Sequence, residues 1–415
     1  MFGLPYNTVV VLFGASLLGG SVGLVGCFAI LRGRALTGDA LAHAALPGVC
    51  LGFLIAGERH LGIMLGGAFL VGLLGINCIA GLRRWTRVKE DAAIGFVLSV
   101  FFGAGVVLNS VIQRLPGTGS KAGLDSFYLG KAAGMSADDV YHIAAMALVL
   151  LLLVALLYKE FKLVTFDSAF AQVQGMSALA LDLLLMAQIA LAVVIGLPIV
   201  GVVMMAGLLI IPGVAARFWT ERLGAMLLLS LLFGFLMGLV GSGISSEVAI
   251  PTGPIIILTG TAIFGGSLLA APRRGLVSRI LAQRRFQRDL DRRKLLRVLF
   301  DLSEPRLPGR AELALADLLQ RRSWQPARLR RLLDEARAAG QVAIADGRYA
   351  LTAGGLQRAA EVARGYRLWE LFLHEYPDMA LAADLTSESV EPVLPAAIVA
   401  DLHAKLKLAG RWPRG

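Results

Sequence analysis

An aspartate and a histidine lie four residues apart in the apolar run LTGDALAHAALPG, which extends from Leu36 to Gly48. On a helix this spacing places Asp39 and His43 on one face, where a carboxylate oxygen and an imidazole nitrogen can approach the same cation. Such a pair of donors suits a first-row transition metal better than sodium, a sugar or a peptide. Asp39 and His43 are therefore candidate metal ligands.

The same two residues also admit a purely structural interpretation. Asp39 and His43 can pair with each other, or cap a helix that is broken near Pro47, without binding anything. An ionisable side chain inside a membrane helix costs roughly 2.5 kcal/mol or more on insertion, and by default it indicates a functional site. The spacing alone leaves both interpretations open.

Other polar residues in apolar stretches are weaker candidates. Glu247, in the run GISSEVAIP, is either a solvated loop carboxylate or a residue that receives metal at the external entrance. Asn109 and Gln188 are expected to form hydrogen bonds between helices. No GxxxxGK[ST] phosphate loop occurs in the sequence, so any ATP hydrolysis belongs to another chain, and we expect this chain not to be an enzyme.

Long apolar runs supply the elements that must position these side chains. The chain has 415 residues, 57% of them hydrophobic, and its mean hydropathy of +0.71 excludes an ordinary soluble globular protein. A membrane helix needs about 20 apolar residues. The expected runs are 8–31, 36–57, 61–82, 92–112, 141–158, 183–213, 223–244 and 254–271. The sixth run is too long for one crossing and is expected to divide at Pro198, which gives nine spans.

Charge divides the chain into two regions. Residues 1–271 carry 14 basic and 12 acidic residues, whereas residues 272–415 carry 26 and 17, so most of the net charge of +11 lies in the tail. With an external N-terminus, ten Lys and Arg residues fall in cytoplasmic loops and four in external loops, as the positive-inside rule requires. We expect a transmembrane domain over 1–272, a basic linker helix over 273–290 and a cytoplasmic domain over 291–408.

Two loops are longer than simple connections. Residues 113–140 are polar and glycine-rich, and a loop of this length is usually functional or partly re-entrant. Residues 166–182, FDSAFAQVQGMSALALD, mix apolar and polar side chains on the predicted cytoplasmic side. This pattern favours short amphipathic helices across the membrane face, where a partner protein can dock.

Four segments carry a family resemblance, namely ALTGDALAHAALPGVCLGFLIAG (35–57), FDSAFAQVQGMSALALDLLL (166–185), GVVMMAGLLIIPGVAARFW (201–219) and IPTGPIIIL (250–258). Together they resemble the membrane permeases of ABC importers for manganese, zinc and iron, over residues 8–272. The resemblance implies an all-α polytopic protein of about nine helices in a bacterial cytoplasmic (inner) membrane. It also implies that Asp39 and His43 coordinate the cation on the translocation path.

The resemblance implies partners as well. Permeases of this kind pair with a second permease chain, either a copy or a paralogue, and with ABC ATPase subunits. An extracytoplasmic binding protein delivers the divalent metal, which is manganese, zinc or iron and is cargo, not a permanently bound cofactor. The family's ATPase-docking region corresponds to residues 166–182. Its expected coupling residues are Phe166, Asp167, Ala171, Gln174 and Gly175.

The basic tail has a pattern of its own. Segments 295–302, 311–320 and 325–339 have helical apolar spacing, and 341–352 predicts two short strands around an Asp-Gly turn. Three helices and a hairpin indicate a soluble α+β domain of the winged-helix type. Nucleic-acid-binding versions of this fold contact DNA through the third helix, which here carries Arg328, Arg330 and Arg331.

From Leu351 the chain resembles metal-responsive repressors related to the diphtheria toxin repressor, in the segments LTAGGLQRAAEVARGYRLWELFL (351–373) and ESVEPVL (388–394). Those repressors bind DNA as dimers and sense iron or manganese. The resemblance implies sensor ligands at Glu370, Glu388 and Glu391.

This second resemblance is incomplete, because Tyr366 and Pro392 stand where those repressors usually have histidine. Loss of the imidazoles weakens any sensor site, so we expect a degenerate site at most. A structural or partner-contact role is favoured over metal sensing, and DNA binding is the least favoured role. The competing interpretation of the whole chain is a membrane-anchored, metal-responsive transcription regulator, which leaves Asp39 and His43 unexplained.

Overall fold

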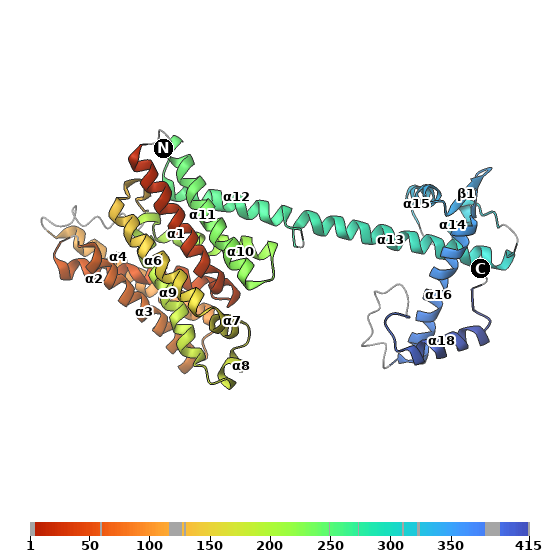
Figure 1. Cartoon of the computed structure of the whole chain (residues 1–415), viewed down its shortest axis with the longest axis horizontal. Helices are drawn as coiled ribbons and strands as arrows, with labels where there is room; N and C mark the ends of the chain where they lie inside the picture. Colours follow the sequence, from red (N-terminus) through yellow and green to blue (C-terminus); the bar gives the residue numbers. More distant parts are fainter. Residues whose placement is uncertain are drawn as a thin grey trace. The chain divides into compact units, whose positions relative to one another are not determined.

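The computed structural model describes residues 5–58, 60–115, 127, 130–248, 250–272, 274–308, 311–321, 324–377 and 391–413, with only the backbone of Ala133 and Val203. Contacts between Cα atoms divide the chain into two units, Met1–Arg279 and Ile280–Gly415 (Figure 1). Each unit contains hydrophobic clusters of its own.

The first unit is a bundle of apolar helices. They are α1 (Tyr6–Leu31), α2 (Ala35–Ala56), α3 (Leu61–Trp85), α4 (Glu90–Arg114), the 3₁₀ turn η2 (Ala132–Gly134), α6 (Ala137–Leu156), α7 (Tyr158–Phe166), α8 (Ser168–Val173), α9 (Ala178–Val200), α10 (Val202–Trp219), α11 (Leu223–Val248) and α12 (Thr252–Ala270). Within the described residues, eight helices are long and apolar enough to cross a membrane, and α10 is apolar but shorter. The short helices α7 and α8 lie at the end of the bundle opposite the N-terminus of α1 (Figure 1).

The long sixth apolar run divides at Gly201 and not at Pro198. Proline has a helical φ and removes only one backbone hydrogen-bond donor. Helix α9 therefore continues through Pro198 to Val200. Gly201 has φ 87° and ψ 158°, a conformation that residues with a side chain adopt only under strain. The helix ends there and α10 begins at the next residue. The predicted division is therefore confirmed, but its position was wrong by three residues.

Glycines let the helices of this unit pack backbone to backbone. A Cβ atom added to Gly19 of α1 would lie 2.2 Å from the carbonyl oxygen of Gly234 in α11. One added to Gly48 of α2 would lie 2.3 Å from the carbonyl oxygen of Gly67 in α3. Small residues at helix contacts are the usual means of close packing in a bilayer. The half of α2 that follows His43 is thereby held tightly against α3.

The second unit combines helices with a hairpin. Its elements are α13 (Leu276–Ser303), which begins just before the boundary, the 3₁₀ turn η3 (Glu304–Arg306), α14 (Leu315–Arg321), α15 (Pro326–Ala338), β1 (Val342–Ala345), β2 (Arg348–Leu351), α16 (Ala353–Glu375) and α18 (Ala396–Leu408). The strands are antiparallel, with Ala345 opposite Arg348. Asp346 and Gly347 between them have φ of 48° and 72°, as a two-residue hairpin turn requires. The predicted strands and turn are confirmed.

Several boundaries in and around the tail differ from those predicted. The segment 273–290 is not a separate linker helix, because α13 runs from Leu276 to Ser303 without a glycine or proline to end it. The helix predicted over 311–320 begins only at Leu315, and Leu313 instead forms a β-bridge with Tyr349. Much of the predicted loop 113–140 lies outside the described residues, and α6 already begins at Ala137.

Candidate functional site

Asp39 and His43 lie in the first half of α2, directly after a short connection from α1. The connection closes α1 in a glycine-centred turn, because Gly33 has φ 69° and the amide of Arg34 donates to the carbonyl of Ala29 at 2.8 Å. The helix α2 then continues through Pro47 and ends at Gly57. The predicted alternative of a helix broken near Pro47 is therefore wrong, and both candidate ligands lie on one continuous helix.

The two side chains face each other across one turn of α2. Nε2 of His43 lies 3.6 Å from Oδ1 of Asp39, and the two side chains are 17% and 29% exposed. This separation exceeds the length of a hydrogen bond. It corresponds to an angle of about 118° at a cation that is about 2.1 Å from each atom, which are ordinary values for zinc and similar metals. The pair is suited to share a transition-metal ion.

The imidazole of His43 is oriented mainly by packing. Its ring meets the ring of Phe102 from α4 edge to face, with the centroids 4.8 Å apart. Its second nitrogen, Nδ1, is buried and has no hydrogen-bond partner among the described residues. Helix α4 therefore forms one wall of the candidate site.

The other polar candidates are not grouped with this pair. No set of three or more His, Cys, Asp or Glu among the described residues is positioned to hold one metal ion. Glu247 is exposed in the last turn of α11. Gln188 in α9 is 2% exposed, and neither of its amide atoms has a hydrogen-bond partner in the described part of the chain. The expected hydrogen bond from Gln188 to another helix is thus not formed.

Five charged side chains surround the connection between α1 and α2, and we call them the connector cluster: Arg32, Arg34, Arg83, Glu90 and Asp182. Nη1 of Arg32 and Nη1 of Arg34 lie 2.8 and 2.6 Å from the Asp182 carboxylate in α9. Arg34 also lies 3.3 Å from Glu90, the first residue of α4, and Arg83 of α3 lies 3.0 Å from Glu90. Burial lowers the pKa of the Arg32 guanidinium, and the charge of Asp182 opposes that shift. The sequence analysis did not pair these residues, which come from four separate helix ends.

The predicted coupling region contains the helix α8. The Asp167 carboxylate caps it by accepting a hydrogen bond from the Phe170 amide at 2.9 Å. Gly175 closes it with φ 80°, and the Met176 amide donates to the Ala171 carbonyl at 3.0 Å. The side chain of Ala171 is buried, whereas Gln174 is exposed at the C-terminus of α8.

Apolar side chains are exposed along this region. They are Phe166, Phe170, Val173 and Leu179, and Val173 is 84% exposed. The structure also corrects the predicted extent of the short helices, because residues 178–182 already belong to α9. The sequence from Phe166 to Leu179 thus exposes apolar side chains near α8, at the end of the bundle seen in Figure 1.

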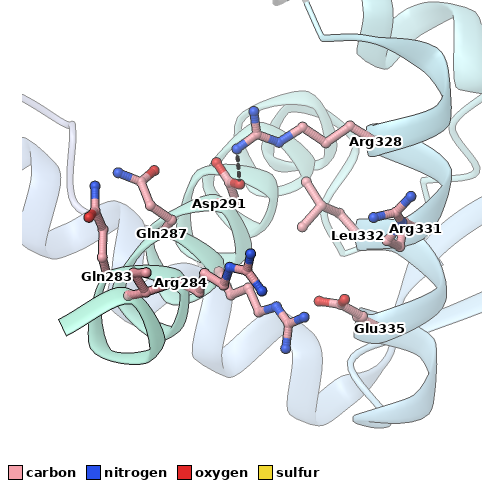
Figure 2. A pocket seen from close by; sticks show the side chains of 10 residues that line it. Gln283, Arg284, Gln287, Asp291, Arg328, Arg331, Leu332 and Glu335 are labelled. Atoms are coloured by element: carbon pink, nitrogen blue, oxygen red, sulfur yellow. Dashed lines mark hydrogen bonds and ion pairs between the residues drawn. The ribbon is translucent and has the colours of Figure 1, made fainter. Parts of the chain in front are cut away.

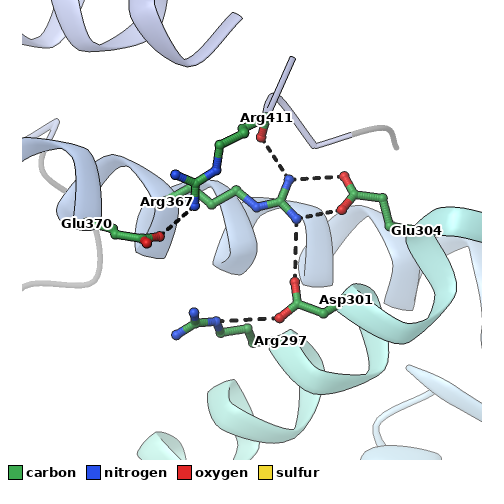
Figure 3. Close-up of polar contacts among 6 residues, drawn as sticks. All are labelled: Arg297, Asp301, Glu304, Arg367, Glu370 and Arg411. Atoms are coloured by element: carbon green, nitrogen blue, oxygen red, sulfur yellow. Dashed lines mark hydrogen bonds and ion pairs between the residues drawn. The ribbon is translucent and has the colours of Figure 1, made fainter. Parts of the chain in front are cut away.

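The predicted sensor ligands of the tail do not share a site among the described residues. Glu370 pairs with Arg411 at 2.7 Å, and Figure 3 shows this pair beside the Arg367 network. Glu391 contacts His403 at 3.1 Å, and Glu388 lies outside the described residues. Hydrogen bonding to Glu304 raises the pKa of Arg367, so this guanidinium keeps its charge. Glu370 and Glu391 thus form separate ion pairs within the second unit.

The arginines of α15 do not form one exposed face. A groove of about 510 Å³ lies between α13 and α15, and Arg328 and Arg331 line it together with Arg284 (Figure 2). Arg328 is paired with Asp291 of α13. Arg330 is not among the lining residues. Two of the three arginines predicted for DNA contact are thus directed toward α13.

The bundle of apolar helices, with the half-buried pair of Asp39 and His43 inside it, fits a polytopic membrane permease of the metal ABC transporter class. The sequence matches the ABC 3 transport family over residues 6–271. The chain belongs to this family.

Three similar proteins support the assignment. The chain is 39% identical over 411 residues to the manganese transport system membrane protein MntC of Bacillus subtilis, covering 98% of this chain and 93% of that protein. It is 43% identical over 281 residues to the zinc transport system membrane protein TroC of Treponema pallidum, covering 68% of this chain and 94% of that protein. The solved structure of PsaBC from Streptococcus pneumoniae in complex with Fab matches with a TM-score of 0.60 and 28% identity, over 68% of this chain and 96% of that chain.

Proposed function

We propose that this chain is the permease subunit of an ATP-driven importer that carries a divalent transition metal across the cytoplasmic membrane. The observation that carries the proposal is the approach of His43 Nε2 to Asp39 Oδ1 at 3.6 Å inside an apolar helix. Carboxylate and imidazole together suit manganese, zinc and iron. The names of the relatives from Bacillus subtilis and Treponema pallidum support manganese and zinc as cargo.

The residues of this chain act by binding and not by covalent chemistry. Asp39 supplies a negative charge and His43 a neutral nitrogen, and α4 supports the imidazole through Phe102. A cation held by two side chains keeps positions free for water, so it can be received and released. Movement of the helices around the pair then exposes it to one side of the membrane or the other.

The exposed apolar surface from Phe166 to Leu179 supports docking of an ABC ATPase subunit in the cytoplasm. Closure of the ATPase pair would displace α8 and the start of α9. The proposal includes a second permease chain, and an extracytoplasmic binding protein that delivers the metal. It also includes nine crossings, with α10 as the shorter one, and an external N-terminus.

The second unit is proposed to be a cytoplasmic winged-helix-like extension with a structural or partner-contact role. Its acidic residues Glu370 and Glu391 are engaged in ion pairs, which does not favour a metal sensor. The competing class, a membrane-anchored transcription regulator, gains no support from relatives that are named as transport membrane proteins.

Uptake of radioactive manganese and zinc by cells that lack their own importers tests the proposal. We expect Asp39→Ala and His43→Ala to lower uptake at least tenfold, because each removes a cation ligand. His60→Ala and Glu58→Ala are matched controls, since they remove an imidazole and a carboxylate outside α2. Normal uptake by Asp39→Ala and His43→Ala at wild-type protein levels would show that the pair is not the transport site.

A further inference from the structure

The connector cluster links three helices that the proposed transport cycle must move together. It contains two acidic residues and three arginines, and its members come from α3, α4, α9 and the connection between α1 and α2. We propose that Arg34 and Asp182 are positioning residues that transmit the movement of α8 to Asp39 and His43. This inference rests on the proposed transport function.

The contact between Arg34 and Asp182 is strong enough to transmit a displacement. Nη1 of Arg34 donates to both carboxylate oxygens of Asp182, at 2.8 and 2.6 Å, and Arg32 contacts the same carboxylate. The side chains of Arg32, Arg34 and Asp182 are only 13%, 20% and 17% exposed. Fully exposed ion pairs contribute almost nothing. In contrast, removing one partner of a buried pair leaves an uncompensated charge.

On one side of this contact, the connection from α8 to Asp182 is short and closed by hydrogen bonds at both ends. The hydrogen bond from Met176 to Ala171 closes α8, and the Ser177 hydroxyl caps α9 by accepting from the Ala180 amide at 3.3 Å. Asp182 is the fifth residue of α9. A displacement of α8 therefore reaches the first turns of α9 and the Asp182 carboxylate.

On the other side, Arg34 is fixed to the helix that carries the candidate ligands. Its amide is bonded to Ala29 at the end of α1, and its carbonyl accepts from the Thr37 amide at 3.1 Å in α2. Asp39 follows five residues later, about 7.5 Å along the helix axis. A displacement of Arg34 therefore moves the first turn of α2, which directly precedes Asp39.

The second carboxylate of the cluster leads to the same site by a different route. Arg34 contacts Glu90, which begins α4, and α4 carries the Phe102 ring that packs on His43. Arg34 is thus joined to Asp182 on the coupling side and, through Glu90, to the wall of the metal site. Arg34 therefore connects α8, through Asp182, to α2 and α4, the two helices that form the metal site.

The test compares transport with ATP hydrolysis in the complete transporter, reconstituted in liposomes with its ATPase subunits and binding protein. Metal moved and phosphate released are measured together. We expect Arg34→Gln and Asp182→Asn to lower the ratio of metal moved to ATP hydrolysed at least tenfold, with ATP hydrolysis retained. The loss in the double variant is expected to be smaller than the two single losses combined, because both changes break the shared contact between Arg34 and Asp182. Asp182→Glu, which keeps the charge, is expected to restore at least half of the ratio.

A matched control is the exposed pair of Glu221 and Arg274 in the same unit, at 2.7 Å, and Glu221→Gln is expected to leave the ratio unchanged. If either variant does not accumulate, Arg34→Lys serves instead, since a single ammonium cannot hold both carboxylates and should give an intermediate ratio. An unchanged ratio in these variants, with wild-type protein transporting metal, would overturn the role of Arg34 and Asp182. Absence of metal transport by the wild-type complex would instead overturn the proposed function.

Discussion

Gln188 is a buried polar residue in the apolar bundle. Its amide is 98% removed from solvent in the middle of α9, and neither polar atom has a partner among the described residues. Asp182 lies six residues earlier on the same helix, so Gln188 is about 9 Å further along the axis. Asp39 is about 7.5 Å from Arg34, which contacts Asp182. Measured along their own helices, Gln188 and Asp39 are thus at similar distances from the contact between Arg34 and Asp182.

An unsatisfied amide predicts a gain in stability when it is removed. We expect Gln188→Leu to stabilise the first unit by about 1–3 kcal/mol, because an apolar side chain of similar size carries no polar group to leave unpaired. The thermal midpoint of the purified protein in detergent would measure this. Gln188→Glu, which adds a charge at the same place, should lower the midpoint. A lower midpoint for Gln188→Leu would mean that the amide has a partner after all.

At the scale of elements, the division between α9 and α10 depends on the backbone of one residue. Gly201 is buried and has φ 87° with ψ 158°, outside the range open to residues with a Cβ atom. The amide of Met205 donates to the Gly201 carbonyl at 3.1 Å, so the same residue also begins the next helix. The angle between the two helices is therefore sensitive to this position.

Substitution of Gly201 should be costly for this reason. We expect Gly201→Ala to destabilise the bundle by about 1–3 kcal/mol through backbone strain. The amount of folded protein in the membrane fraction and its thermal midpoint would both fall. Gly266→Ala in α12 is the control, because a Cβ atom there meets nothing within 4 Å. Equal behaviour of the two variants would show that Gly201 relaxes without cost.

The elements also show what sequence reasoning can and cannot reach. Hydropathy located the long apolar helices, and the four-residue spacing placed Asp39 and His43 on one face of a helix, because both signals are local. The break at Gly201 was misplaced, since a sequence records that proline disturbs a helix but not which glycine adopts a positive φ. The pairing of Arg34 with Asp182 joins positions 148 residues apart, and no local pattern connects them. The continuity of α13 differs from the prediction because the arginine-rich segment 273–290 contrasts in composition with the apolar segment 295–302. No glycine or proline separates the two segments, so one helix runs through both.

At the scale of the whole molecule, the chain consists of a unit of the ABC 3 transport family followed by an additional unit. The alignment with TroC spans 281 residues and 94% of that protein, whereas the alignment with MntC spans 411 residues. The match to the family ends at residue 271. The two relatives thus differ in how much of this chain they share.

We expect from this comparison that the additional unit is not required for metal to pass through the bundle. A chain truncated after Gly275 should retain at least half of the metal uptake of the full chain, because Asp39, His43, the connector cluster and α8 all remain. Uptake would be normalised to the amount of protein in the membrane. Loss of nearly all uptake at a normal protein level would show that the additional unit takes part in transport itself.

The limited exposure of Arg32, Arg34 and Asp182 bears on how their contacts respond to the ionic composition of the surrounding solution. Mobile ions screen surface charges over about 8 Å at physiological ionic strength but reach buried pairs far less. Because Arg32, Arg34 and Asp182 are each at most 20% exposed, a rise in intracellular potassium should leave their contacts nearly unchanged. The proposed coupling of metal transport to ATP hydrolysis would then change little when a bacterium raises its internal potassium under osmotic stress.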